Sequence, residues 1–340
     1  MVVKAILIIY DDGLTEKEHT MDPLVSIIIP AFNAEKYIKE TIDSVFDQTF
    51  QDFEIIVVDD GSTDNTREIL NQYGKRIRCI YQENSGPSKA RNTAIKAAHG
   101  EHIAFLDADD LWKSDFLERT VHIMQGHSEL GYVFTEFDLF SKDGVITRHQ
   151  IKDDGRVAQI PVGWQSGDEK IFARSIWSDL ATGCFIPTSG ILIRRIALEK
   201  VGLFDEGLTH AEDRDLFIRL AREYDVGFID ECLSHKRQHP LGIGQDLEKV
   251  VIGSDVVIRR LLARNDVDAT LRRTIKKRLG KQWYLLGRSY LGKNNAKSAR
   301  DSFKKSFPLY PAIHSLCFFI FSVTGLFRPL RALKKYIIRK

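Results

Sequence analysis

One pattern repeats along the first third of the chain and limits the folds open to it. A β-branched run of strand character is followed by a polar turn and then by apolar residues at helical spacing. Such runs lie at residues 25–29, 54–58 and 77–81, and a fourth ends at Leu106. Strands that alternate with helices in this way indicate βαβ units. We therefore predict an α/β fold with a mainly parallel sheet and helices on both faces.

Polar clusters directly follow three of these strands, at residues 30–33, 59–64 and 107–110. In open parallel sheets, ligands bind beyond the carboxyl ends of the strands, so the three clusters should converge on one crevice. Just beyond the second cluster, Asn65 and Glu68 match a capping box that would begin the next helix. The chain has neither a GxGxxG fingerprint nor a Walker Gly-Lys-Ser/Thr, so we expect neither a dinucleotide-binding fold nor a P-loop NTPase.

The most informative cluster is Asp107-Ala108-Asp109-Asp110, which places three carboxylates at the end of an apolar strand. Such groups repel one another unless a cation or solvent shares the charge. Side chains alternate along a strand, so Asp107 and Asp109 should point to the same side. Oxygen ligands of this kind suit Mg²⁺ or Mn²⁺ bound together with substrate phosphates. Taken alone, the segment is equally compatible with a turn whose carboxylates cap the next helix.

Two later segments carry further candidate groups. Glu212 and Asp213 fall in the first turn of a predicted helix, where a carboxylate can act as a general base or simply stabilise the helix N-terminus. Residues 234–240 gather Lys, Arg and two His after a predicted strand. A phosphate or metal contact and a charged surface loop are both open for that cluster.

Composition excludes several classes of protein. The formal net charge of +2 is too small to indicate nucleic-acid binding. The four cysteines form no CxxC pair, so we predict neither a zinc site nor a disulfide framework, and a reducing compartment fits. The apolar run within residues 1–10 is too short for a signal peptide or a span, and we treat 1–21 as an N-terminal extension.

From about residue 249 the chain is predicted to be helical and basic, an appendage to the α/β domain. Residues 313–327 are apolar but short for a membrane span, and residues 328–340 carry six basic and no acidic side chains. This pairing is typical of an interfacial anchor on an anionic membrane surface, although a buried helix with a solvated basic end would have the same pattern. We expect a cytoplasmic protein in peripheral contact with the inner face of the membrane through 313–340.

In combination and in this order, the motifs resemble those of the family 2 glycosyltransferases, which have the GT-A fold. The resemblance spans about residues 24–245. The segments that carry it are Val25–Asn33, Glu54–Thr66, Gly86–Asn92, Gly100–Trp112, Glu212-Asp213 and Arg237–Pro240. It implies an inverting transferase that moves a sugar from a nucleotide sugar, most often a UDP-sugar, to a glycan or lipid-linked acceptor with the help of Mg²⁺ or Mn²⁺.

The resemblance also implies roles for individual residues. The base of the nucleotide would contact Asp60 in a pocket lined by three neighbours: Pro30, Ala31 and Phe32. Arg91 would lie near the nucleotide, and Asp107 beside the ribose and the metal. The remaining roles would be metal ligation by Asp109, a metal or pyrophosphate contact by His239, and general base catalysis by Asp213. Phe32 stands where the family often has Tyr, which removes a hydroxyl but keeps a ring for stacking.

On this interpretation residues 22–115 bind the nucleotide sugar, 116–248 bind the acceptor and carry the base, and 249–340 form the basic helical region. A catalytically inactive transferase-fold scaffold at the membrane is the alternative, but it has no need for clustered carboxylates that repel one another. A metal-dependent nucleotidyltransferase would need a Lys or a Gly-rich segment after the first strand, which residues 31–34 do not provide.

Overall fold

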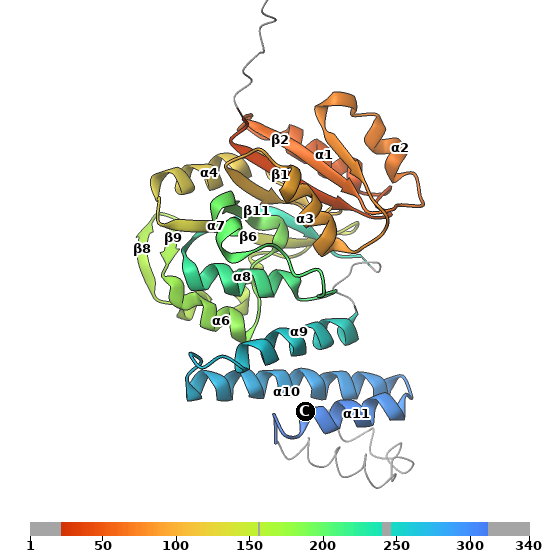
Figure 1. The fold of residues 1–340 in the computed structure, drawn as a ribbon, viewed down its shortest axis with the longest axis vertical. Helices are drawn as coiled ribbons and strands as arrows, with labels where there is room; N and C mark the ends of the chain where they lie inside the picture. The colour runs from red at the N-terminus through yellow and green to blue at the C-terminus, as the bar shows by residue number, and fades with distance from the viewer. Residues whose placement is uncertain (1–21, 156, 240–245, 312–340) are drawn as a thin grey trace, which may run out of the picture.

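The computed structural model describes residues 22–155, 157–239 and 246–311 (Figure 1). The N-terminal extension 1–21 and the segment 313–340, with its predicted membrane contact, lie outside the described residues. Within them, one mixed sheet is covered by helices, and a separate layer of helices follows it.

The strands are β1 (Val25–Ala31), β2 (Phe53–Asp59), β3 (Arg78–Tyr81), β4 (His102–Phe105), β5 (Leu111–Trp112), β6 (Leu130–Ser141), β7 (Gly144–Thr147), β8 (Val162–Ser166), β9 (Glu169–Phe172), β10 (Ile191–Arg194) and β11 (Asp225–Arg237). The α-helices are α1 (Ile38–Phe46), α2 (Thr66–Asn71), α3 (Pro87–Ala97), α4 (Phe116–Gly126), α5 (Gln150–Asp154), α6 (Trp177–Thr182), α7 (Arg195–Val201), α8 (Glu212–Glu223), α9 (Leu247–Leu262), α10 (Ala269–Gly292) and α11 (Ala296–Ser306). Short 3₁₀ turns occur at Gly74–Arg76, Val157–Gln159, Arg174–Ile176 and Thr188–Gly190.

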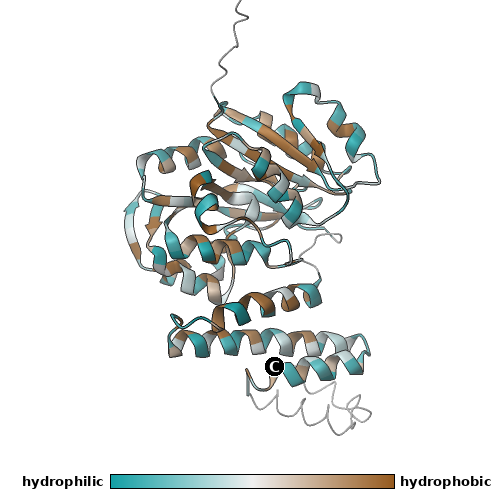
Figure 2. Cartoon of the chain, in the orientation of Figure 1, coloured by the Kyte–Doolittle hydropathy of each residue, from teal (hydrophilic) through white to brown (hydrophobic). Residues whose placement is uncertain are grey.

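The first half of the sheet has the predicted parallel arrangement. The strand order is β3-β2-β1-β4-β10-β6-β11-β9-β8, and the first four strands are parallel. Strand β1 is buried on both faces, because Ile27 and Ile29 pack into the core on one side of the sheet and Ile28 into the core on the other. Figure 2 shows hydrophobic residues concentrated on these strands. The carboxyl ends of β1, β2 and β4 therefore meet at one edge.

The second half of the sheet is mixed. Strand β10 lies antiparallel between β4 and β6, and it joins the parallel pair β6 and β11 to the first four strands. The hairpin of β8 and β9 continues the sheet beyond β11. Residues 141–175, which hold this hairpin, are weakly patterned in the sequence and could not be assigned to elements from it. The reason is that β8 is exposed at every residue and so lacks the alternation of a half-buried strand.

The predicted capping box at the start of α2 is wrong. No side-chain hydrogen bond from Asn65 caps the helix. Instead, Asn65 Nδ2 donates to Glu35 Oε2 at 2.8 Å, while Asp64 Oδ1 accepts from Thr66 N at 3.0 Å. The Asn65 side chain therefore bonds to the loop after β1, although the local sequence predicted that it would cap α2.

The C-terminal helices form the predicted appendage. Helix α9 packs on α8, α10 on α9 and α11 on α10, in a stack beyond the sheet (Figure 1). Gly287 permits the close approach of α11, since a Cβ at this position would lie 2.6 Å from the ring of Phe303. Trp283 Nε1 donates to Asp255 Oδ1 at 3.0 Å and ties α10 to α9. Within the described ranges, no helix is both long and apolar enough to cross a membrane.

Candidate active site

A cavity of about 870 Å³ lies at the carboxyl ends of β1, β2, β4, β6 and β11. The three polar clusters converge there, as the topology predicts. Eight of the nine candidate site residues line the cavity: Pro30, Ala31, Phe32, Asp60, Arg91, Asp107, Asp109 and His239. The ninth, Asp213, lies in the first turn of α8 and is not among the lining residues.

Two loops form the wall of the cavity beside β1 and β2, and they are joined by hydrogen bonds. Asn33 adopts a left-handed conformation with φ of 49°. Its Oδ1 accepts from Thr63 N at 2.8 Å, and its own N–H donates to Ser62 Oγ at 2.9 Å. Ala34 N donates to the Oγ1 of Thr66 at 2.8 Å. The loop after β1 is therefore held by the loop after β2, with the ring of Phe32 49% exposed at the cavity.

Asp60 is buried and holds the segment that leads into α3. Its Oδ1 accepts from Gln82 Nε2 at 2.7 Å and from Ser85 N at 2.9 Å, and its Oδ2 accepts from Gly86 N at 2.8 Å. The next residue, Gly61, has φ of 78°, and a Cβ there would lie 2.8 Å from a backbone nitrogen. The tight turn after β2 thus requires glycine.

Arg91 connects the end of β4 with the start of α8. Its Nη2 donates to Asp107 Oδ1 at 2.7 Å and its Nη1 to Glu212 Oε1 at 2.9 Å. Burial alone would raise the pKa of Asp107, but the neighbouring charges of Arg91 and Lys236 hold it below its ordinary value. Burial raises the pKa of Glu212, and Arg91 only partly offsets the effect. The sequence placed Glu212 in the first turn of a helix beside the candidate base Asp213, and it did not indicate this pairing with Arg91.

Asp109 and His239 lie against each other. Asp109 Oδ2 and His239 Nε2 are 2.7 Å apart, although 130 residues separate them in the chain. The imidazole packs at 5.0 Å from the ring of Tyr37, and its buried Nδ1 has no hydrogen-bond partner among the described residues. A carboxylate oxygen and an imidazole nitrogen that converge on one point of a cavity fit a divalent cation, and Mn²⁺ accepts both ligand types.

Asp110 is a residue that the sequence analysis did not select for a role. It is buried, and its Oδ2 accepts from Ser189 Oγ at 2.6 Å while its Oδ1 accepts from Arg237 N at 2.8 Å. Burial raises the pKa of Asp110 to about 7. Ser189 Oγ also accepts from Asp107 N at 3.1 Å, and its carbonyl accepts from Trp112 Nε1. Asp110 and Ser189 therefore fix the turn that carries Asp107 and Asp109.

Asp213 lies in the first turn of α8, directly after Glu212. Its Oδ1 accepts from Arg214 N at 2.6 Å, and the preceding Ala211 has φ of 64°. Burial would lower the pKa of Lys236, a residue that lines the cavity, but four surrounding carboxylates raise it: Asp110, Asp107, Asp213 and Asp109. The charge of Asp213 is thus felt inside the cavity.

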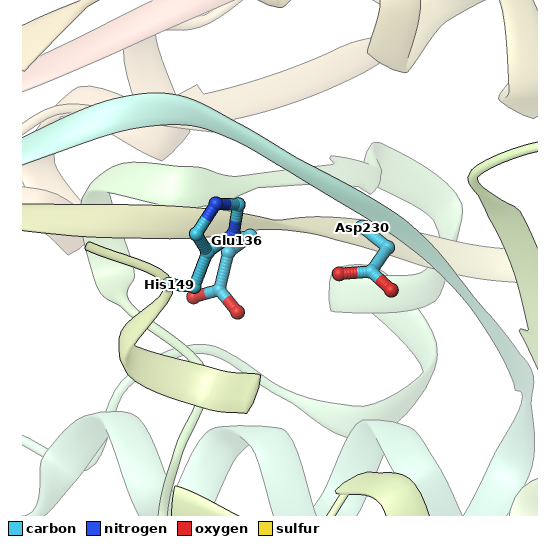
Figure 3. Close-up of side chains that lie close together, drawn as sticks. All are labelled: Glu136, His149 and Asp230. Atoms are coloured by element: carbon cyan, nitrogen blue, oxygen red, sulfur yellow. The ribbon is translucent and has the colours of Figure 1, made fainter. Parts of the chain in front are cut away.

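A second group of metal-ligating types lies elsewhere, where Glu136, His149 and Asp230 bring their ligand atoms within 4.8 Å of one another (Figure 3). Both carboxylates already have partners, although the buried Oδ1 of Asp230 has none among the described residues. Glu136 accepts three backbone N–H groups at 2.7–2.9 Å, two of them in the first turn of α5, and Asp230 Oδ2 accepts from Lys170 Nζ at 2.7 Å. We interpret this group as the anchor of α5 on β6 and β11.

The sequence profile described as "Glycosyl transferase family 2" matches residues 26–202. The chain belongs to this family. The resemblance noted in the motifs is therefore confirmed.

Among curated relatives, the "Putative teichuronic acid biosynthesis glycosyltransferase TuaG" of Bacillus subtilis is 48% identical over 126 residues, which are 36% of this chain and 50% of TuaG. Alignments with TuaG and the other first relatives span between half and two thirds of those proteins' length. The relatives are therefore longer than the part that this chain matches.

Two solved structures resemble the family member described here. S. aureus TarS 1–349 in complex with UDP-GlcNAc has a TM-score of 0.59 and 19% identity, with 88% of each chain covered. The mannosyltransferase PcManGT from Pyrobaculum calidifontis, in complex with GDP-Man and Mn²⁺, has a TM-score of 0.56 and 17% identity, with 93% of this chain and 84% of PcManGT covered. At these identities the likeness concerns the fold, and the predicted GT-A-like α/β fold is confirmed.

Proposed function

We propose that this family 2 member is an inverting glycosyltransferase that moves a sugar from a nucleoside diphosphate sugar, a UDP-sugar in our assignment, to a hydroxyl of a glycan or lipid-linked acceptor. The observation that carries the proposal is the cavity in which Asp109 and His239 converge beside Asp107. TarS and PcManGT, which share the fold, are described with UDP-GlcNAc and with GDP-Man and Mn²⁺.

We assign the base of the donor to the wall formed by Pro30, Ala31, Phe32 and Asp60. The exposed ring of Phe32 offers a face on which a base can stack. A carboxylate has about four lone-pair sites, and three hydrogen bonds to Asp60 leave room for one N–H of a base. Arg91 and Asp107 complete this half, with Arg91 setting the position of the Asp107 carboxylate toward the ribose.

Asp109 and His239 are the residues that would hold Mg²⁺ or Mn²⁺ in this site. Such an ion supplies positive charge that balances the donor diphosphate. The contribution of the chain is to position the two ligands. Arg237 Nε donates to the Asp109 carbonyl at 2.8 Å, and the ring of Tyr37 packs against the imidazole.

The general base in this proposal is Asp213. It takes the proton of the acceptor hydroxyl while the oxygen forms a bond to the anomeric carbon, and the bond from that carbon to the diphosphate breaks with its electron pair. One displacement of this kind inverts the anomeric configuration. Glu212, held by Arg91 at 2.9 Å, fixes the first turn of α8 on which Asp213 lies.

We further propose that residues 22–115 bind the donor and residues 116–248 the acceptor. The name of TuaG refers to teichuronic acid biosynthesis, which supports a role in polysaccharide biosynthesis. We also propose that the basic C-terminal region 249–340 contacts the inner face of a membrane through residues 313–340. The inactive scaffold at the membrane is the competing function.

A calorimetric titration tests the proposal. The full chain is titrated with UDP and GDP in the presence and absence of Mn²⁺, alongside Asp109→Ala. Asp52→Ala is the matched control, because Asp52 is exposed and does not line the cavity. We expect metal-dependent nucleotide binding that Asp109→Ala abolishes and Asp52→Ala retains. Failure of both nucleotides to bind the wild type would favour the scaffold.

A further inference from the structure

The cations that line the cavity differ in whether a partner already holds them. Arg91 is engaged by two carboxylates. Arg237 donates to the Asp109 carbonyl and to Glu40 Oε2, and its guanidinium lies over the ring of Tyr37 at 4.7 Å. Lys36 and Lys236 line the same cavity as solvent-accessible residues, and in the described part of the chain neither ammonium has a hydrogen bond or an ion pair. Lys236 differs from Lys36 in that atoms of the cavity wall and the carboxylates of Asp107, Asp109 and Asp110 surround it. A free ammonium inside a substrate cavity needs an explanation.

The sheet explains why Lys236 lies where it does. Lys236 lies near the end of the paired segment of β11 and β6, where its register partner is Leu139. Both residues line the cavity. Strand β5 pairs with β11 just before this point, through Ser234 with Trp112. Arg237 N then donates to Asp110 Oδ1. These contacts bring the end of β11 beside the carboxylates that follow β4.

The charges around Lys236 match a polyanionic ligand that arrives with a cation. Asp107 forms an ion pair with Arg91, and Asp110 accepts hydrogen bonds from Ser189 and from the Arg237 backbone. Neither carboxylate forms an ion pair with Lys236. Their field, together with that of Asp109 and Asp213, keeps the ammonium charged. A charged amine on a flexible stem suits phosphate oxygens, for which lysine acts as a point charge.

We propose that Lys236 is a catalytic residue whose ammonium binds the terminal phosphate oxygens of the leaving nucleoside diphosphate. The assignment rests on the proposed function. As the bond between the anomeric carbon and the diphosphate oxygen breaks, the electron pair stays on that oxygen and negative charge grows there. The ammonium attracts this charge more strongly in the transition state than in the bound donor, which lowers the barrier. No bond to Lys236 forms, and its proton stays on the amine.

A purely structural role predicts something different. If Lys236 only balanced the four carboxylates, its removal would disturb the whole cavity and weaken every ligand alike. A phosphate contact instead acts on the diphosphate and leaves the nucleoside unaffected. A ligand series that differs only in phosphate therefore separates the two roles.

The experiment compares Lys236→Met and Lys236→Arg with the wild type in the full chain. Lys89→Met is the control, since Lys89 is an exposed lysine on α3 outside the cavity lining. Uridine, UMP and UDP are titrated by calorimetry with Mn²⁺ and again with EDTA, and the guanosine series is used if the wild type prefers GDP. Turnover of the matching donor gives kcat and KM.

We expect Lys236→Met to bind UDP about ten- to a hundredfold more weakly while uridine binds as before, with or without metal. Its kcat should fall about a hundredfold, and Lys236→Arg should recover most of the loss. Equal UDP affinity and kcat in Lys236→Met would overturn the assignment, and so would an equal loss for uridine and UDP. A wild type that binds no nucleoside diphosphate would overturn the proposed function itself and the assignment with it.

Discussion

Replacing Arg91 by methionine should destabilise the fold, because it removes the counter-ion of two carboxylates at once. The side chain of Arg91 is 6% exposed, and its ion pairs with Asp107 and Glu212 measure 2.7 and 2.9 Å. Removing one partner of a buried ion pair costs about 3–5 kcal/mol. Asp107 keeps 26% of its side chain exposed, so water recovers part of the loss and we expect about 3 kcal/mol. For a chain of 340 residues that cost lowers the Tm by roughly 4 °C.

The assay is a thermal melt followed by fluorescence, with urea unfolding as an independent measure of the free energy of unfolding. Lys39→Met is the matched control, because the Lys39–Asp43 pair is exposed at 68% and 45% and should contribute less than about 1 kcal/mol. Adding Glu212→Gln to Arg91→Met should recover part of the stability, since one of the stranded charges is gone. If Arg91→Met melts as Lys39→Met does, the buried pairs do not hold α8 to β4.

Three other outcomes follow from the same contacts. Ser189→Ala removes the hydroxyl that donates to Asp110 at 2.6 Å, so it should cost about 1–3 kcal/mol in urea unfolding; a loss below 0.5 kcal/mol would contradict this. Burial raises the pKa of Cys232 to about 12, so native protein at pH 8 should alkylate there far more slowly than unfolded protein, as peptide mass spectrometry would show. Burial would raise the pKa of Glu54, but the hydrogen bond from Ser26 and its other partners lower it below 4.5. The stabilisation that ionised Glu54 contributes is therefore present above pH 4.5 and is lost as the pH falls through its lowered pKa. The difference in Tm between the wild type and Glu54→Gln should accordingly shrink from pH 7 to pH 4.

Local sequence was sufficient for the first half of the sheet. Strands such as β1 and β2 are continuous apolar runs buried on both faces, so their identity depends little on their partners. The topology rule for strand ends then predicted that Asp60, Asp107 and Asp109 would line one cavity, and they do. The hairpin of β8 and β9 was missed because only its pairing with β11 makes it a strand region.

The contacts that complete the site depend on tertiary structure and leave no local trace. Arg91 meets Glu212 across 121 residues, and Ser189 meets Asp110 across 79. From the sequence alone, the side chains of Arg91, in a helix, and Ser189, in a loop, could equally well be solvent-exposed. The failed capping box has the same cause, since Asn65 bonds to another loop. Long-range hydrogen bonds and ion pairs, set by the tertiary fold, therefore determine which polar side chains form the site.

The central claim is that the cavity transfers a sugar, and a direct assay tests it. Donor consumption from a panel of nucleotide sugars is measured with Mn²⁺ or Mg²⁺ by ³¹P NMR, and the anomeric configuration of the sugar product by ¹H NMR, for the wild type, Asp109→Ala and Asp213→Ala. We predict that one donor releases its nucleoside diphosphate with inversion at the anomeric carbon and that both substitutions abolish this turnover. Asp213→Ala should still bind the donor, because it removes the base alone. Full turnover in either variant, or release of sugar with retained configuration, would contradict the account.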